Sequence, residues 1–165
     1  MANFRKILMP TVVPPEVSLR EVRVSDLPIL FEHQLDPEAT RMAAFPSRDR
    51  DAFMAHWTKI MANPDGVLRT ILSAGSVAGY IGAWTDGADR LVGYWIGREF
   101  WGRGIASAAL SQFLRYENTR PLTAHVAKHN AASIRVLRKA GFKLTGENAF
   151  DLPGDATDEE FVFKL

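Results

Sequence analysis

The stretch GYWIGREFWGRGIAS (residues 93–107) joins a predicted strand to a predicted helix through a loop that contains two glycines. The strand is the apolar run that ends at Ile96, and the helical pattern begins after Gly104. Gly102 and Gly104 lie on either side of an arginine. Backbone N–H groups in such a loop converge on one position, and the start of a helix adds partial positive charge there. The stretch therefore predicts an anion site, with a ligand-free tight turn as the alternative.

The spacing of the glycines excludes three common phosphate-binding loops. A P-loop requires a lysine and then a serine or threonine after its last glycine, whereas Ile105 and Ala106 follow Gly104. A dinucleotide-binding loop requires a third glycine where this chain has Ser107. A kinase loop requires H-R-D and D-F-G sequences further along, and neither follows. The predicted anion therefore belongs to a different kind of phosphate-bearing ligand.

Length and composition indicate one globular domain. The chain has 165 residues, of which 47% are hydrophobic and 24% charged. We expect an irregular N-terminal arm over residues 1–16 and a single domain over residues 17–165. The net charge of +1 shows no basic excess for nucleic-acid binding, and no apolar run approaches the length of a membrane span. The absence of cysteine excludes disulfides and fits a reducing compartment, so we expect a cytoplasmic protein without nucleic-acid or membrane partners.

Hydrophobic periodicity predicts an α/β fold. Helices are expected within residues 25–61, after Gly104 and over residues 130–141, with Ser25, Asp36 and Ser47 as candidate caps of the early helices. The predicted strands cover residues 18–24, 67–74, 77–85, 91–97, 122–128, 142–148 and 159–165. The three consecutive strands in the middle form an antiparallel meander. We therefore expect a mixed, mostly antiparallel central sheet of about six to seven strands, flanked by about four helices.

A second motif, NAASIRVLRKAGF (residues 130–142), follows one predicted strand after the glycine loop. Asn130 is a favoured N-cap residue, and Gly141 suits the position just past the helix end. The two motifs, in this order, resemble the GCN5-related N-acetyltransferase (GNAT) superfamily, and within it the RimJ/RimL-like branch that acetylates protein N-terminal amines. The order of elements is similar over roughly residues 17–165, and the motifs match over about residues 93–142.

The resemblance implies a GNAT fold whose sheet splays between the strands at 91–97 and 122–128. It also implies acetyl-CoA as the co-substrate, with its pyrophosphate on the loop amides and its pantetheine arm along the strand before the loop. In the family, the asparagine at position 130 also contacts the arm. The residues expected to bind acetyl-CoA are Ile96, Gly97, Arg98, Trp101, Gly102, Arg103, Gly104, Ile105, Ala106, Asn130 and Ser133.

The resemblance also indicates how the leaving thiolate is protonated. Many GNAT enzymes place a tyrosine seven residues after the asparagine, but here that residue is Leu137. Ser133 is the candidate general acid in its place, with simple packing as the alternative. Thiols have a pKa near 8.5, so the thiolate needs little assistance and the missing tyrosine does not argue against activity.

The acceptor side is less defined by the sequence. His33 is the candidate base because the pKa of histidine suits neutral pH, although a structural histidine is the alternative. Weaker candidates for the base are Glu32, Glu38 and Asp86, and candidates for an acceptor pocket are Met42, Phe45 and Trp84. His125 and His129 have a metal-like spacing, but on a strand they lie about 13 Å apart, so no metal is expected.

The predicted reaction is direct attack of a primary amine on the thioester of acetyl-CoA. The branch resemblance favours a protein or peptide N-terminal amine as the acceptor. Alternatives are a small-molecule amine such as a polyamine, amino acid or aminoglycoside, a non-catalytic acyl-CoA-binding module, and a different nucleotide-binding protein. Homodimers are common in the family, so a homodimer is a further expectation.

Overall fold

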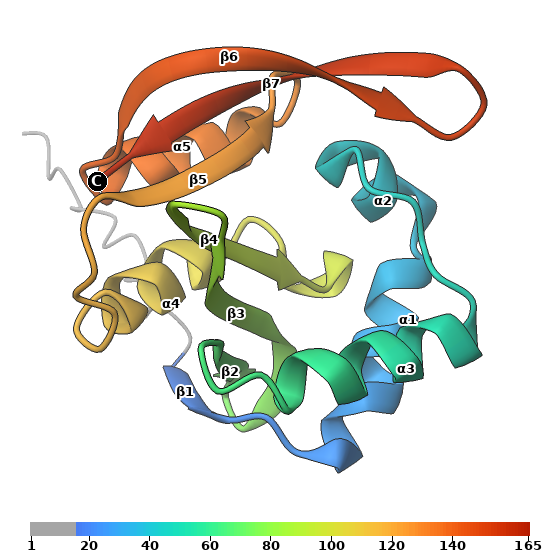
Figure 1. Cartoon of the computed structure of the whole chain (residues 1–165). Helices are drawn as coiled ribbons and strands as arrows, with labels where there is room; N and C mark the ends of the chain where they lie inside the picture. Colours follow the sequence, from blue (N-terminus) through green and yellow to red (C-terminus); the bar gives the residue numbers. More distant parts are fainter. Residues whose placement is uncertain (1–15) are drawn as a thin grey trace, which may run out of the picture.

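The computed structural model describes residues 16–165 as one seven-stranded sheet with helices on both faces (Figure 1). The order across the sheet is β1-β2-β3-β4-β5-β7-β6, and every neighbouring pair is antiparallel except β4 and β5. The strands are β1 Val17–Glu21, β2 Val67–Ser73, β3 Ser76–Asp86, β4 Asp89–Ile96, β5 Leu122–Ala127, β6 Lys143–Leu152 and β7 Ala156–Lys164. The predicted fold class is confirmed. The predicted N-terminal arm lies outside the described residues except for Glu16, whose carbonyl accepts from the Ala74 N–H.

Within residues 16–165, five α-helices accompany the sheet, one more than the approximate number expected. They are α1 Leu27–Leu35, α2 Pro37–Ala43, α3 Arg50–Met61, α4 Ile105–Phe113 and α5 Ala131–Lys139. Asp36 caps α2 as predicted, since its carboxylate accepts from the Ala39 N–H. Ser25 and Ser47 are not caps: the first lies inside a short 3-10 turn, and Asp49 caps α3 instead. No helix within residues 16–165 is long and apolar enough to cross a membrane.

The two faces of the sheet carry separate cores because side chains alternate along each strand. Ile81 on β3 packs with α4 and α5 in the larger core, which also contains Leu110 and Phe163. The preceding residue, Tyr80, packs on the other face against the smaller core of α1 and α3 around Trp57. Figure 1 shows these two helix groups on opposite sides of β2–β4. A ligand near the middle of the sheet is therefore approached differently from each face.

β4 and β5 separate after a short contact, as expected. They pair in parallel only at Arg90↔Leu122 and Leu91↔Thr123. On its other side, β4 pairs with β3 along the whole length of β4. From residue 92 to Ile96, the outer edge of β4 thus has no strand partner among residues 16–165. Backbone groups in a protein interior need hydrogen-bond partners, so this edge is suited to an extended ligand.

The β6–β7 hairpin is longer than predicted. Its pairing continues to Leu152↔Ala156, while β5 pairs only with the last five residues of β7. The distal half therefore projects past β5, above α2 (Figure 1). Most of β6 is exposed on both faces. Its sequence consequently lacks the apolar–polar alternation that predicts a strand.

Candidate active site

Gly102 and Gly104 give the loop after β4 a backbone shape that other residues rarely adopt. Their φ angles are +73° and +74°, in the left-handed region that favours glycine. A Cβ atom at either position would meet no protein atom within 4 Å, so both glycines border open space. A ligand can therefore lie directly against this backbone.

The amides of the loop are available to such a ligand. Within residues 16–165, the N–H groups of Gly102, Arg103 and Gly104 donate to no backbone carbonyl. Gly104 is the N-cap of α4, whose first N–H groups have no acceptor inside the helix and whose first turn carries no acidic residue. The loop and the helix start together present a positive, donor-rich surface, which is the geometry that binds phosphate.

A pocket of about 470 Å³, here called the loop pocket, opens beside these amides. It is bordered by the end of β4, the loop, the start of α4, one side of α5 along its length, and α2. Trp101 fixes its rim, because the indole N–H donates to the Ile96 carbonyl at 2.9 Å. The residues expected to bind acetyl-CoA that line it are Ile96, Trp101, Gly102, Gly104, Ile105, Ala106, Asn130 and Ser133.

Asn130 and Ser133 are joined at the start of α5. The Asn130 side-chain oxygen accepts from the Ser133 N–H at 3.1 Å, which makes Asn130 the N-cap that its position predicts. The Ser133 hydroxyl oxygen accepts from the Tyr94 hydroxyl at 3.1 Å. Burial raises the pKa of Tyr94, with the Ser133 hydrogen bond acting in the opposite direction. The neutral tyrosine therefore remains a donor, and the Ser133 hydrogen is left to donate into the pocket.

Tyr94 was not singled out by the sequence motifs. It lies 39 residues before Ser133, and only the course of β4 past α5 brings the two hydroxyls together. The motif places the expected tyrosine on α5, seven residues after Asn130, but that residue is Leu137, which is buried in the core. The feature of the sequence that could have identified Tyr94 is the aromatic pair Tyr94 and Trp95 near the end of a predicted strand.

A second cavity of about 720 Å³, here called the sheet cleft, lies mainly on the opposite face of the sheet. It is bordered by β2–β5, α3, the segment between α2 and α3, and the β6–β7 hairpin. It meets the loop pocket where β4 and β5 separate, and the residues that line both cavities are Ala43, Tyr94, Trp95, Asn130 and Ser133. A molecule in one cavity can therefore react with a molecule in the other.

Aromatic side chains form part of the cleft wall. Trp84 is 40% exposed and lies over Gly93, where a Cβ would come within 3.2 Å of its ring. Phe45, from the segment between α2 and α3, is 46% exposed. Both were candidate pocket residues and both line the sheet cleft, whereas Met42 lines the loop pocket.

The family model for the acetyltransferase (GNAT) domain matches residues 16–143 of this chain. The chain belongs to the GNAT acetyltransferases. It is therefore an acetyl-CoA-dependent acyltransferase, as the resemblance implied.

Relatives of this GNAT acetyltransferase share its fold over most of their length. An uncharacterized N-acetyltransferase p20 of Bacillus licheniformis is 26% identical over 158 residues, covering 84% of this chain and 85% of its own. Mycobacterium smegmatis RimJ in complex with CoA-disulfide has a TM-score of 0.72 at 21% identity, covering 90% and 81% of the two chains. The Vibrio cholerae spermidine N-acetyltransferase in complex with CoA and spermine has a TM-score of 0.77 at 16% identity, covering 89% and 94%.

His125 of this GNAT enzyme forms a pair with Glu160 that the sequence did not predict. The two residues come from β5 and β7, and the distance from Nδ1 to Oε1 is 2.6 Å. Both line the sheet cleft. Along β5, His125 points to the opposite side from its neighbours Ala124 and Val126, which belong to the larger core. In the neutral ring, a carboxylate beside Nδ1 favours the tautomer with its hydrogen on Nδ1, and Nε2 then carries the lone pair.

His33 lies elsewhere. It is buried under the end of β4, with Nε2 3.5 Å from the Glu99 carboxylate, and it lines neither cavity. A Cβ at Gly97 would lie 2.6 Å from the same nitrogen, and Phe100 contacts the ring edge-on. Burial lowers the pKa of His33, and Glu99 opposes this change. The contacts of His33 are those of a packing residue, and its role as base remains a prediction.

The other predicted site residues are also placed by their contacts. Arg98 lies 3.4 Å from Asp36, and Arg103 lies over the Phe100 ring. Neither these arginines nor Gly97 line the loop pocket. The weaker base candidates, Glu32, Glu38 and Asp86, line neither cavity. Within residues 16–165, no group of three or more metal-ligating side chains is found.

Proposed function

We propose that this enzyme transfers an acetyl group from acetyl-CoA in the loop pocket to a primary amine in the sheet cleft. The observation that carries the proposal is that the two cavities meet at Tyr94, Trp95, Asn130 and Ser133. A module that only binds acyl-CoA would need the loop pocket alone. A second cavity that opens onto the same point supports a reaction between two bound molecules.

Three features of the chain fit acetyl-CoA as the donor. The loop amides and the start of α4 suit the pyrophosphate. The unpaired edge of β4 suits the amide groups of the pantetheine arm. The open space at Gly102 and Gly104 allows the phosphates to approach the backbone. The thioester would then lie near Tyr94 and Ser133, where the two cavities meet.

In the proposed reaction, His125 accepts a proton from the amine through Nε2, and Glu160 holds the ring in position. The amine nitrogen forms a bond with the acetyl carbon, and the carbon–sulfur bond breaks. Ser133 donates its hydroxyl hydrogen to the departing sulfur while the Tyr94 hydroxyl passes its own hydrogen to Ser133. Solvent then carries the proton taken by His125 back to Tyr94, so that all three groups return to their starting state. Because a thiolate is already a stable leaving group near neutral pH, this assistance modulates the rate and is not a requirement.

For the acceptor, we propose a peptide or protein α-amine in preference to a polyamine. Polyamines carry several positive charges, which need acidic partners. Glu160 is the one carboxylate among the described residues that line the sheet cleft, and it already pairs with His125. The open cleft, with Phe45 and Trp84 on its wall, favours an acceptor with an apolar body.

An amine panel with acetyl-CoA tests the function by release of free CoA, and calorimetry with CoA, NAD and ATP tests the donor. We expect CoA to bind, NAD and ATP not to bind, and peptides with a free α-amine to be turned over. Binding of NAD without CoA would contradict the donor assignment. Binding of CoA without turnover of any amine would leave an acyl-CoA-binding module.

A further inference from the structure

We infer that Arg48 forms an anion-binding subsite in the sheet cleft, so that the acceptor is an α-amine compound that also carries a carboxylate. This inference rests on the proposed transferase function and names the class of acceptor.

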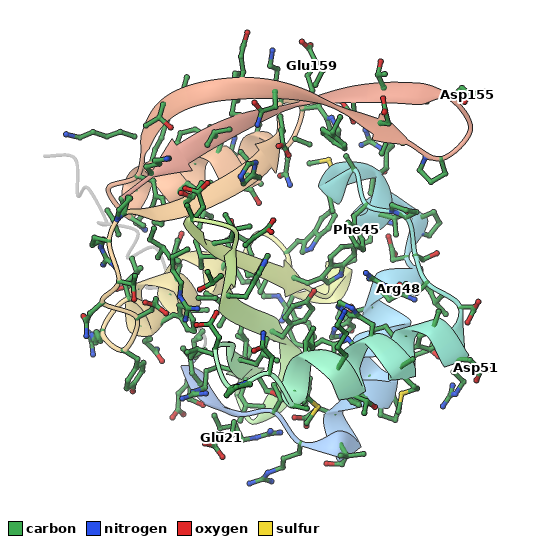
Figure 2. The ribbon with its side chains drawn as sticks, viewed as in Figure 1. Glu21, Phe45, Arg48, Asp51, Asp155 and Glu159 are labelled. Atoms are coloured by element: carbon green, nitrogen blue, oxygen red, sulfur yellow. The ribbon has the colours of Figure 1, made fainter. Side chains whose placement is uncertain are left out.

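Arg48 is half-buried in the wall of the sheet cleft. Its guanidinium lies 4.9 Å from the centre of the Phe45 ring (Figure 2 labels both residues). Within residues 16–165, no carboxylate forms an ion pair with it, although Arg20, Arg41, Arg90 and Arg98 all have such partners. A guanidinium stacked on an aromatic face keeps its N–H groups free at the edge, where they can bind a carboxylate in bidentate fashion.

The backbone of Arg48 is fixed in place by a buried side chain. The Gln34 amide oxygen accepts from the Arg48 N–H at 2.7 Å, and its nitrogen donates to the Arg48 carbonyl at 2.8 Å. Gln34 lies on α1 and is 8% exposed. These two bonds anchor the segment between α2 and α3 and position Arg48 before any ligand arrives, which reduces the ordering cost of binding.

The remaining charges of the cleft favour an anion. Glu160 already has a hydrogen-bond partner in His125, at 2.6 Å, so its carboxylate is less available to a ligand. His56 lines the same cleft, and burial and the positive charge of Arg48 lower its pKa. His56 thus tends to stay neutral, and Arg48 is left as the fixed positive charge among the described cleft residues. A second cation on the acceptor would be repelled, and a carboxylate would be attracted.

The two ends of the cleft therefore select two groups of one molecule. The amine is held where the cavities meet, near Ser133 and His125, and the carboxylate is held at Arg48. The carboxylate can be the α-carboxylate of a short peptide or an acidic side chain near the N-terminus of a longer one. Phe45 and Trp84 contact the apolar part between these groups.

Binding of dipeptides to the CoA-saturated protein tests the subsite. The probes are Ala-Phe, its C-terminal amide, and Ala-Asp amide, measured by calorimetry and by acetyl-CoA turnover. We expect Ala-Phe to bind at least about tenfold more tightly than its amide, the effect of one charge-assisted pair. Tight binding of Ala-Asp amide would assign the subsite to acidic side chains, and weak binding would assign it to the α-carboxylate. Equal affinities for Ala-Phe and its amide, or no binding of Ala-Phe or Ala-Asp amide at millimolar concentration, would overturn the inference.

The variant Arg48→Gln should bind Ala-Phe and its amide equally, and Arg48→Lys should restore part of the difference. Because the test is a ratio within one variant, partial loss of folded protein does not affect it. Arg50→Gln is the matched control, since Arg50 is exposed on α3 and does not line the cleft. CoA affinity should be unchanged in all three. If the unsubstituted enzyme does not bind CoA, the donor proposal is contradicted. If Arg48→Gln keeps the same ratio of affinities for Ala-Phe and its amide, only the subsite is contradicted.

Discussion

Gly104 is a residue on which we expect donor binding to depend. Gly104→Glu places a negative side chain in the open space beside the loop amides, and we expect CoA binding to be lost. Gly104→Ala is the matched control, because it carries the same strain at φ +74° without the charge or bulk. Calorimetry with CoA and thermal melting of both variants make the comparison. Normal CoA affinity in Gly104→Glu would show that the pyrophosphate binds elsewhere.

Ser133 and Tyr94 are expected to act on turnover and not on donor affinity. Ser133→Ala removes the donor to the departing sulfur, and we expect kcat to fall about tenfold with little change in CoA affinity. Tyr94→Phe should give a smaller loss, since it removes only the bond that supports the serine. Steady-state kinetics and calorimetry separate these effects, with exposed Ser111→Ala on α4 as the control. An unchanged kcat in Ser133→Ala would identify the serine as a packing residue.

The pairing of β5 with β7 makes a testable prediction at the level of elements. His125 and Glu160 meet only because these strands are neighbours. We expect His125→Gln to lower kcat/KM about a hundredfold, and Glu160→Gln to lower it less, because the ring remains but is no longer held. His129→Gln is the control, since His129 contacts the Arg41 carbonyl and lines neither cavity. If both His125→Gln and His129→Gln retain full activity, another group or water accepts the proton.

Asp26 links β1, α1 and β2 through a buried carboxylate. It accepts from the Arg20 guanidinium, the Arg23 N–H and the Thr70 hydroxyl, and the Arg20 bond is the main reason that its pKa falls to about 2. Against an unfolded value of about 3.9, this difference contributes about 3 kcal/mol to the free energy of unfolding above pH 4. The contribution is lost as the pH falls from about 4 toward 2.

Urea unfolding of Asp26→Asn checks this contribution. We expect a loss of about 3 kcal/mol at pH 7, because the buried carboxylate is removed and the half-buried Arg20 guanidinium loses its partner. The difference from the unsubstituted protein should narrow at pH 3, since only the unsubstituted protein has the titrating group. Asp51→Asn, at an exposed carboxylate in the first turn of α3, is the control. A difference that is constant between pH 7 and pH 3 would contradict the assignment.

The sequence predicts the elements well where a local pattern defines them. Asn130 and Gly141 bound α5 because a cap and a left-handed glycine act within one turn. The prediction of Ser47 as a helix cap is wrong because Asp49, two residues further along, caps α3 with its carboxylate. The β6–β7 hairpin exceeds its predicted length because strands exposed on both faces show no alternation of apolar residues. The glycine loop could be predicted for the same reason as α5, because the strand, turn and helix that form it are contiguous in the sequence.

The whole molecule sets the order of events. The loop pocket and the sheet cleft lie mainly on opposite faces and meet at the separation of β4 and β5, so we expect both substrates to be bound together. The sequence also lacks cysteine, the most common acyl carrier among side chains. We expect intersecting lines in double-reciprocal plots when acetyl-CoA and the amine are varied together. Parallel lines would indicate an acetyl-enzyme and contradict direct attack.

The parts of the site that the sequence could not predict are those that depend on the sheet order. Tyr94 meets Ser133 across 39 residues, and His125 meets Glu160 across 35. No local spacing encodes either pair, because both depend on which strands are neighbours and where β4 and β5 separate. The same is true of Arg48, whose position depends on Gln34 14 residues earlier.

The small overlap between the two cavities has an evolutionary consequence. Among residues 16–165, only Ala43, Tyr94, Trp95, Asn130 and Ser133 line both, so we expect most of the sheet cleft to tolerate substitution without a change in donor binding. Phe45, Arg48 and Trp84 belong to that independent set. We therefore expect that a few substitutions in the sheet cleft can change which amine is accepted while the residues that bind coenzyme A stay the same.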